Sequence, residues 1–373
     1  MKGKRPTLLS QFSTPNLFVT CALPLAHLDS LSYFLILLTK GVKLLSIKSK
    51  LLKKLQECED DFVSGAALAN ELLVSRAAIW KAVESLRAEG YGILAVTNKG
   101  YQLQCSGDIL SGDGIAGYIK TPDVFKVEVL KKVTSTNSLL REMAARGESE
   151  GYVLAAEEQT EGKGRIGKKF HSPARHGVYF SLLLRPGSKT KDATLITSAA
   201  AVAVARAIES VFGVNTGIKW VNDLFVGDKK VCGILTEASF DMESGLVESA
   251  VLGIGINITS PETGFPDDIR DVATAVTDRN TGMSHERCKL IAATLDNFWE
   301  FYQNLEKRAF LNEYRLRSII LNKAINVISQ DGQRHAVALA IDDDCRLLVR
   351  YDTGETAALG SGEVSIRSIE SET

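Results

Sequence analysis

The sequence predicts an α+β protein in which a helical segment, a mixed segment and a strand-only tail follow one another along 373 residues. Three observations carry this prediction. Apolar residues recur at helical spacing in the first segment, and strand patterns mix with amphipathic helices in the second. The third contains only short strand patterns separated by turns. Strands and helices that do not alternate regularly are typical of the α+β class.

Composition places the chain among ordinary globular proteins. Hydrophobic residues make up 45% and charged residues 24%, and the net charge is −1. Any contact with nucleic acid must therefore come from a local basic patch. The six cysteines and five histidines show no metal-ligand spacing. We therefore expect reduced thiols, a cytoplasmic location and no structural metal.

Residues 1–45 match nothing further along the chain. Residues 17–38 are apolar, but Pro24 and Asp29 interrupt them. The longest unbroken run, residues 33–38, is far shorter than the roughly 20 apolar residues that a membrane span needs. We expect a poorly ordered extension; a membrane anchor is the alternative.

Residues 46–105 are predicted to form a winged helix-turn-helix. Leu51, Leu52 and Leu55 line one face of a first helix, and two further helices are joined by a short turn. A hairpin with a tight turn then supplies the wing. The expected elements are helices 65–71 and 76–88, capped by Ser64 and Ser75, and strands 92–96 and 101–103.

The third helix carries small and basic residues on the side away from its apolar face. Such residues suit a helix whose N-terminus enters the major groove and contacts phosphates. A solvated helix in a scaffold module is the alternative, and we expect Trp80 to pack rather than to contact DNA. The candidate DNA-binding residues are Gly65, Ser75, Arg76, Ala78, Lys81 and Glu84.

Beyond residue 105 the pattern changes. Residues 106–114 are polar and glycine-rich and are predicted to be a linker. Residues 115–320 are predicted to form one domain around a mixed sheet, and residues 321–373 a small five-stranded barrel. The expected strands are 127–130, 153–156, 177–184, 218–220, 224–226, 231–235, 246–258, 324–329, 335–341, 346–351, 355–358 and 364–367, with helices at 135–145, 195–211 and 286–305.

The mixed segment is centred on a glycine- and cation-rich loop, Gln159–Phe170. Its glycines allow the backbone to approach a ligand closely, and its alternating lysines and arginine suit a phosphate. The spacing G-x-G-x-x-G is weak evidence alone, and here a strand pattern follows it, unlike in a dinucleotide fold. We predict an anion-holding loop between two strands; a solvated glycine-rich turn is the alternative.

Further motifs accompany this loop in a definite order. They are Thr134–Asn137, Ala155–Gln159, Lys219–Leu224, Lys230–Glu237 and Gly253–Asn257. The ordered set resembles the biotin protein ligases over roughly residues 46–370. With the winged helix-turn-helix, the chain is similar to the bifunctional members that also repress biotin operons.

The resemblance implies a catalytic domain of the biotin/lipoyl-ligase type and an SH3-like C-terminal barrel. It also implies a reaction in which biotin and ATP, with Mg²⁺, form biotinyl-5′-AMP. The biotinyl group then passes to a lysine of the biotin carboxyl carrier domain of acetyl-CoA carboxylase or another carboxylase. Operator DNA and a ligand-promoted homodimer are the other partners that it implies.

Negative charge accumulates as a carboxylate approaches the α-phosphate, so the reaction needs cations and oriented amides. Lys219 and Arg165 are therefore the candidate catalytic residues, although a lone strand lysine is more often solvated. The chain departs from the family where Val221 replaces the usual proline, Lys163 the common arginine and Phe170 the usual tryptophan.

The resemblance also assigns binding roles. The candidate biotin-binding residues are Ser135, Thr136, Asn137, Gln159, Lys163, Gly164, Arg165 and Lys219. The candidate nucleotide-binding residues are Gly162, Gly167, Lys168, Asn222, Asp223, Asn257 and Arg367. Mg²⁺ is expected beside Asp223, although an aspartate in a turn needs no metal, and simple helix capping is the alternative interpretation of Ser135.

Two other functions stay open. One is a lipoate or octanoate transferase-like enzyme, since those enzymes share the catalytic fold but lack the winged helix-turn-helix. The other is a ligand-sensing transcription factor without ligase activity, against which the presence of both Lys219 and Arg165 argues.

Overall fold

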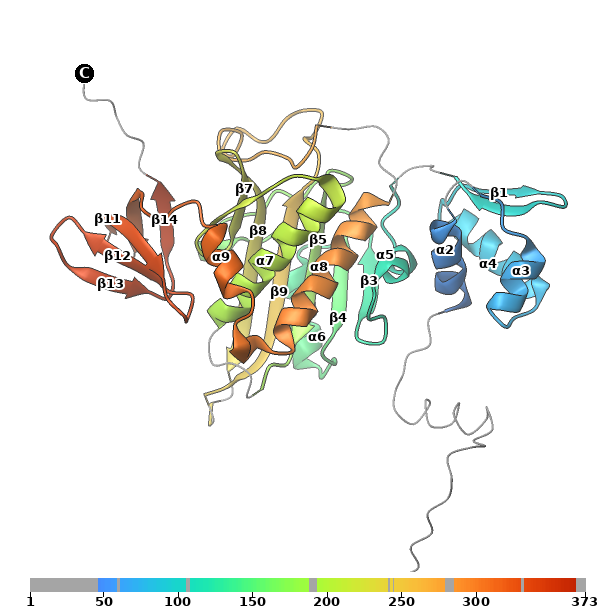
Figure 1. The fold of residues 1–373 in the computed structure, drawn as a ribbon, viewed down its shortest axis with the longest axis horizontal. Helices are drawn as coiled ribbons and strands as arrows, with labels where there is room; N and C mark the ends of the chain where they lie inside the picture. The colour runs from blue at the N-terminus through green and yellow to red at the C-terminus, as the bar shows by residue number, and fades with distance from the viewer. Residues whose placement is uncertain are drawn as a thin grey trace, which may run out of the picture. The chain divides into compact units, whose positions relative to one another are not determined.

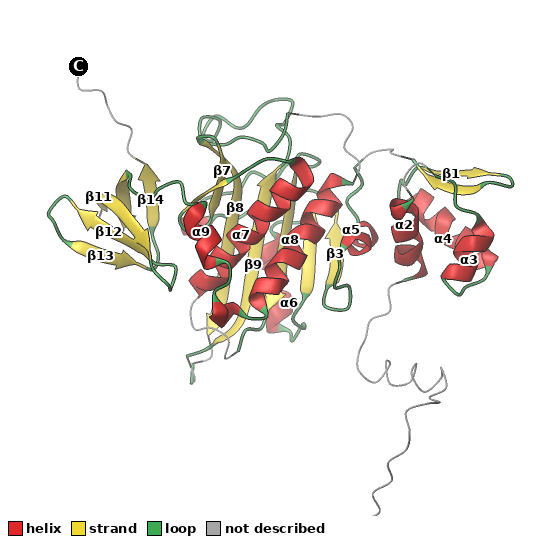
Figure 2. Ribbon diagram, viewed as in Figure 1, coloured by secondary structure: helices red, strands yellow, loops and turns green. Residues whose placement is uncertain are grey.

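The computed structural model describes residues 46–58, 61–104, 108–187, 193–240, 242–243, 245–278, 285–329 and 332–366. All of them belong to one compact unit, Leu45–Thr373. The predicted extension at residues 1–45 and the candidate nucleotide ligand Arg367 lie outside the described residues. The elements are labelled in Figure 1 and coloured by type in Figure 2.

The first segment is a winged helix-turn-helix, as predicted. Its elements are α2 (Ile47–Glu57), α3 (Gly65–Glu71), α4 (Arg76–Ala88), β1 (Ile93–Val96) and β2 (Gly100–Leu103). Ser64 and Ser75 cap α3 and α4, because each hydroxyl accepts a hydrogen bond of 3.1 Å from the backbone N–H three residues later. Leu51, Leu55 and Ile79 lie in a separate core cluster.

The second segment is built on one seven-stranded sheet in the order β3-β4-β5-β9-β8-β7-β6. Only the β3–β4 pair is parallel. The strands are β3 (Lys126–Leu130), β4 (Tyr152–Ala156), β5 (Gly177–Leu184), β6 (Gly217–Lys219), β7 (Asp223–Val226), β8 (Lys229–Phe240) and β9 (Val247–Asn257). The helices are α5 (Gly112–Tyr118), α6 (Thr136–Ala145), α7 (Ala193–Phe212), α8 (Glu286–Tyr302) and α9 (Leu311–Leu316), with short 3-10 turns η1 (Arg165–Gly167) and η2 (Leu305–Lys307).

The two faces of this sheet have different roles. Successive side chains of a strand point to opposite faces. Phe180 and Leu182 of β5 pack in the large core cluster with α7 and α8, which cover one face in Figure 1. Leu183 and Val251 instead pack with Leu140 of α6 in a smaller cluster. The rest of this second face is left for the loop between β4 and β5.

Helix α7 is the most apolar helix of the described chain. It is long and apolar enough to cross a membrane, and 72% of its most apolar window is buried inside the protein. Residues Ala199–Ala205 are all fully buried against the sheet and α8. A core helix has this burial on all sides.

All five strands predicted for the C-terminal barrel are present, and they form one antiparallel sheet in the order β13-β12-β11-β10-β14. They are β10 (Ala324–Ser329), β11 (Gly332–Ile341), β12 (Leu347–Tyr351), β13 (Thr356–Leu359) and β14 (Glu363–Ile366). Several contacts join this C-terminal segment to the second segment, and two of them lie near the loop between β4 and β5 or the end of β6. The Trp220 indole N–H donates to the Cys345 carbonyl at 2.9 Å, and Lys168 forms an ion pair with Glu363.

The structure differs from the sequence prediction at the linker. Residues 112–114 are the first turn of α5, and Ser111 caps this helix by accepting from the Gly114 N–H at 2.9 Å. The two glycines in this turn hid the helix, because glycine is a poor helix former. Helix α9 was also not predicted, because its six residues are too few for a periodic pattern.

Candidate active site and DNA-binding surface

A row of glycines forms the floor of the candidate site. Gly233 of β8 pairs in register with Gly255 of β9, and Leu235 pairs with Gly253. A Cβ atom at Gly253 would lie 2.0 Å from Asn137 Oδ1, and one at Gly255 would lie 2.5 Å from the Phe170 ring. Asn137 and Phe170 therefore lie directly on the strand backbone. Any larger residue at these glycine positions would clash with them.

A polar wall stands beside this floor at the start of α6. Ser135 caps the helix, and Thr136 donates from its N–H and its hydroxyl to Gln159 Oε1 at 2.8 and 3.1 Å. The Ser181 hydroxyl bonds to Thr136 Oγ1 at 2.7 Å and to Asn137 Oδ1 at 2.6 Å. These buried groups hold one another in place before any ligand arrives.

The predicted cationic loop joins β4 to β5 and folds back on itself. Lys163 pairs with Lys169 as a β-bridge, and the Phe170 N–H donates to the Gly162 carbonyl at 2.8 Å. The prediction of a loop between two strands, rather than a loop opening a helix, is confirmed. At its tip Ile166 has a φ of 53° and is 71% exposed.

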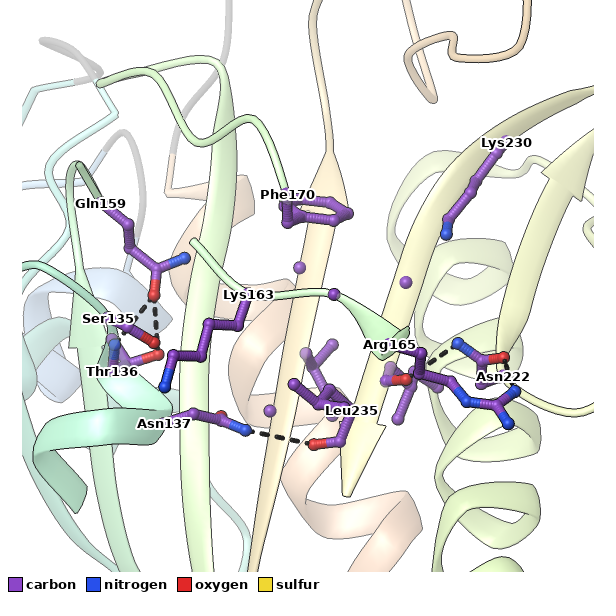
Figure 3. A pocket seen from close by; sticks show the side chains of 16 residues that line it. Ser135, Thr136, Asn137, Gln159, Lys163, Arg165, Phe170, Asn222, Lys230 and Leu235 are labelled. Atoms are coloured by element: carbon purple, nitrogen blue, oxygen red, sulfur yellow. Dashed lines mark hydrogen bonds between the residues drawn. The ribbon is translucent and has the colours of Figure 1, made fainter. Parts of the chain in front are cut away.

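Floor, wall and loop enclose a cavity of about 460 Å³, counting the solvent at its open mouth. Figure 3 shows Lys163 extending toward the polar wall and Arg165 pointing the other way, toward Asn222. The lining residues are Ser135, Thr136, Asn137, Gln159, Lys163, Gly164, Arg165, Phe170, Asn222, Lys230, Gly233, Ile234, Leu235, Gly253, Ile254 and Gly255.

The end of the cavity away from the polar wall is cationic, and a series of linked polar contacts holds its side chains in place. Arg165 donates to Asn222 Oδ1 at 2.9 Å, and the Asn222 amide donates to Asp223 at 2.9 Å. Lys230 forms an ion pair with Asp223 at 2.7 Å. The sequence analysis did not assign Lys230 to the site, and its position three residues before Gly233 of the same motif was the available signal.

Lys219 lies beside this half but is not among the residues that line the cavity. It ends β6, pairs in register with Asp223, and its Nζ is 5.6 Å from the centre of the Phe225 ring. Burial lowers the pKa of the Lys219 ammonium below its usual value, although Asp223 and Glu363 act in the opposite direction. Lys219 is thus a partly dehydrated cation at the edge of the site.

The other candidate nucleotide-binding residues lie outside the cavity lining. Lys168 is engaged by Glu363 of β14, and the Asn257 amide donates to the Thr274 carbonyl at 3.2 Å. Gly162 packs against the backbone of Phe170. Gly167 has a φ of 72° and nothing near its Cβ position, which suits the turn at the loop tip.

Gly253→Ala is expected to weaken biotin binding about 10- to 100-fold, because the new methyl group displaces Asn137 and overpacking costs about 1–3 kcal/mol. Isothermal titration with biotin measures the change. Gly360→Ala is the matched control, since a Cβ atom there meets nothing within 4 Å. Equal biotin affinity in both variants would show that the glycine floor does not carry the ligand.

The candidate DNA-binding surface lies on α4. Ser75, Arg76 and Lys81 are exposed as expected, whereas Glu84 forms an ion pair with Arg87 at 2.8 Å. Ala78 is half-buried, and Gly65 packs on the ring of Tyr101, where a Cβ atom would come within 3.2 Å.

Trp80, expected to be a partly buried packing residue, is 59% exposed and so packs less than expected. Ile79, Val83 and Leu86 fill the inward face of α4, which leaves position 80 on the outer face with Arg76.

Trp80→Ala is expected to weaken operator binding about tenfold or more, because burying a large apolar side chain against DNA contributes about 1.5–3 kcal/mol. Ligase activity should not change. Gel shift at fixed salt measures the effect. The control is Phe240→Ala, which removes another exposed aromatic residue, 51% exposed, outside this module. An unchanged operator affinity in Trp80→Ala would remove the indole from the interface.

Together these features define a class of protein: a small-molecule enzyme whose cavity is bordered by a cation-rich loop, joined to a winged helix-turn-helix. Comparisons with known proteins agree. Residues 129–257 match the model of the biotin/lipoate A/B protein ligase family, residues 48–102 match an HTH domain, and residues 320–367 match the biotin protein ligase C terminal domain.

Relatives match along most of the chain. The bifunctional ligase/repressor BirA of Bacillus subtilis is 34% identical over 313 residues, which cover 83% of this chain and 95% of the relative. BirA of Escherichia coli is 28% identical over 83% of this chain and 94% of its own. The solved structure of the biotin protein ligase from Aquifex aeolicus, in complex with biotin and ATP, superimposes with a TM-score of 0.54 at 26% identity, covering 65% of this chain and 98% of that one. The chain therefore belongs to the biotin protein ligase family, among its bifunctional ligase/repressors.

Proposed function

We propose that the chain joins biotin to a lysine of a biotin carboxyl carrier protein at the expense of ATP, and that it also represses transcription through its winged helix-turn-helix. One observation carries the enzymatic part. A wall of buried hydrogen-bonding groups and a cluster of cations face each other across one glycine floor, which suits a polar ring at one end and a phosphate at the other.

In this proposal the polar wall holds the ureido ring of biotin. Ser135, Thr136, Asn137 and Gln159 supply both donors and acceptors, already oriented by one another and by Ser181. A site that pairs such groups rejects ligands lacking them by about 10⁴–10⁵. Lys163 extends toward this wall and adds a positive charge at its edge (Figure 3).

The cationic half holds ATP and then the adenylate. Arg165 is bound to the Asn222 amide, a weak partner that an α-phosphate would replace, because an arginine fork prefers an anion. Lys219 moves its ammonium toward the carboxylate and α-phosphate as their charges converge. Phe170 lies on Gly233 and Gly255, so its ring covers the part of the floor between the two halves.

Activation proceeds by attack of the biotin carboxylate on the α-phosphorus, which gives biotinyl-5′-AMP and releases pyrophosphate. The carrier lysine then attacks the acyl carbon, forms the amide and releases AMP. No protein nucleophile is required. This chain's part is to align the two reactants and to stabilise the charge that develops between them.

Mg²⁺ would reach the site with ATP, since Mg²⁺ commonly binds through phosphates, waters and one or two carboxylates. Asp223 fits as a single protein ligand, because its partner Lys230 is itself a cation that ATP would attract away. Mg²⁺ would supply charge neutralisation of the phosphates.

For the second activity we propose that α4 enters the major groove of operator DNA through Ser75, Arg76 and Lys81. A ligand-promoted homodimer would place two such modules on adjacent half-sites. We also propose a cytoplasmic location, which fits the free thiols of Cys58, Cys232, Cys288 and Cys345.

The test is release of pyrophosphate from ATP, titrated with biotin and separately with lipoate. We expect biotin to drive the release at far lower concentration than lipoate, because a lipoyl ring does not use the donors of the polar wall. Release driven better by lipoate would favour the transferase-like alternative. No release with either ligand, alongside tight biotin binding, would favour a sensor without ligase activity.

A further inference from the structure

Arg287 is a buried arginine with no part in the site described above. It lies in the first turn of α8, its side chain is 2% exposed, and two carboxylates from distant parts of the chain share its guanidinium. Its Nε binds the Asp108 carboxylate, and its two terminal nitrogens donate to the Glu157 carboxylate at 2.6 and 3.2 Å. The second terminal nitrogen also donates to the Asp108 carbonyl at 2.5 Å.

The electrostatics of this cluster favour its present geometry. Burial alone lowers the pKa of the Arg287 guanidinium, but the hydrogen bonds to Glu157 and the charge of Asp108 outweigh burial and leave the pKa raised. Removing either carboxylate would leave buried guanidinium N–H groups without an acceptor, which is costly, so both contacts have to be kept together. The planar fork also fixes direction, because both nitrogens must align with the carboxylate.

The Glu157 side of the cluster leads to the pocket. Glu157 directly follows β4, and its N–H donates to the Leu130 carbonyl at 2.9 Å. Gln159 lies two residues further, and its Oε1 accepts the two hydrogen bonds from Thr136. The contact that fixes the Glu157 carboxylate therefore also fixes the backbone at the end of β4, and with it the position of Gln159.

The Asp108 side leads to the winged helix-turn-helix. Residues 108–113 are bound to α8 through Arg287 and through the Cys288 thiol, which donates to the Ile109 carbonyl at 3.3 Å. The same segment contacts the N-terminal module, since the Ser111 hydroxyl bonds to Tyr91 at 2.6 Å and Asp113 forms an ion pair with Lys48 at 2.6 Å.

We propose that Arg287 is a positioning residue for biotin, which places Gln159 through Glu157 and makes that placement depend on residues 108–113. The inference rests on the proposed role of Gln159 in biotin binding. Because one guanidinium holds both carboxylates, a shift of the end of β4 moves the loop before α5, and a shift of that loop moves the end of β4. Biotin that fixes Gln159 thereby also orders the segment that follows the winged helix-turn-helix.

The experiment uses the full chain with Glu157→Gln and Arg287→Lys. Each variant keeps a hydrogen-bonding group but breaks the fork. We expect the KM for biotin to rise by roughly tenfold or more in both, since a small misplacement of a positioning group has effects of that order. The kcat and the KM for ATP should stay close to the wild-type values. Asp108→Asn, which spares the pocket side, should give a smaller rise in the KM for biotin.

Glu313→Gln is the matched control. Glu313 accepts from Arg206 and Arg317 and has the same exposed fraction as Glu157, 24%. It should cost similar thermal stability and leave the KM for biotin unchanged. Lower melting temperatures in Glu157→Gln and Arg287→Lys with an unchanged KM for biotin would reduce the cluster to a structural role and overturn the proposal.

Amide hydrogen exchange is a second test, because a purely structural role of Arg287 would not make the exchange near Ser111 depend on biotin. The N–H groups of Gly114 and Ile115 both donate to Ser111. Biotin should slow their exchange in the wild type and have less effect in Glu157→Gln. Equal protection by biotin in both proteins would overturn the coupling. A wild-type protein that does not bind biotin would instead contradict the proposed function itself.

Discussion

Replacing Lys219 by alanine is expected to slow formation of the adenylate by about 100- to 1,000-fold, while biotin binding stays close to that of the wild type. A group aimed at developing charge is worth about 3–4 kcal/mol in the transition state. Lys219 does not line the cavity of the free protein, so little biotin affinity should depend on it. Single-turnover release of pyrophosphate measures the rate, and titration with biotin alone measures the binding.

The melting temperature of Lys219→Ala shows whether a slower reaction reflects lost chemistry or a partly unfolded protein. Burial lowers the pKa of Lys219 in the folded protein, so the unfolded chain binds that proton more tightly. The charged ammonium therefore costs folding free energy below its folded-state pKa, and the cost disappears as pH rises past that value. Lys219→Ala should not lower the melting temperature at neutral pH.

Lys229→Ala is the control for this prediction. Lys229 is an exposed lysine at the start of β8, which β7 separates from β6, and its Nζ donates to the Arg270 carbonyl at 3.2 Å. Its loss should change neither rate nor stability appreciably. Wild-type pyrophosphate release in Lys219→Ala would take this lysine out of the mechanism.

Local patterns in the sequence were sufficient for most elements. The bounds of α3 and α4 follow from a serine cap and a helical apolar stripe, both of which depend on residues within one or two turns. The strands of the mixed sheet were predicted because buried strands read as apolar runs. Helix α5 was not predicted because the glycines of its first turn disfavour a helix, and α9 was not predicted because its six residues, without a side-chain cap, show too little periodicity.

The contacts within the site are non-local, and the sequence could not give them. The pairing of Gly233 with Gly255 depends on the register of two strands, and the ion pair of Lys230 with Asp223 depends on the β7–β8 pairing. A motif places each residue on an element but does not say which side chains meet above the sheet. The cluster of Arg287, Asp108 and Glu157 joins residues up to 179 positions apart.

Biotin together with ATP is expected to raise the affinity of the chain for its operator, and added apo-carrier protein is expected to reverse the effect. Ordering of the loop around Gly162–Lys169 by the adenylate would cost about 2–5 kcal/mol, as in coupled folding and binding. An ordered loop could then complete a homodimer surface and bring two copies of α4 to adjacent half-sites. Carrier protein would compete because it consumes the same adenylate.

Ligand binding and dimerisation are thermodynamically linked. Biotin and ATP must tighten dimerisation by the same factor by which dimerisation tightens their retention. The affinity should also fall by roughly 10³–10⁵ between 50 and 200 mM salt if the dimer contacts 6–10 phosphates. Sedimentation and gel shift are measured in parallel on the wild type and on Lys219→Ala, in which biotin and ATP should no longer raise operator affinity because little adenylate forms. Operator binding indifferent to biotin and ATP in the wild type would contradict the coupled repressor and leave a ligase that carries an independent DNA-binding module.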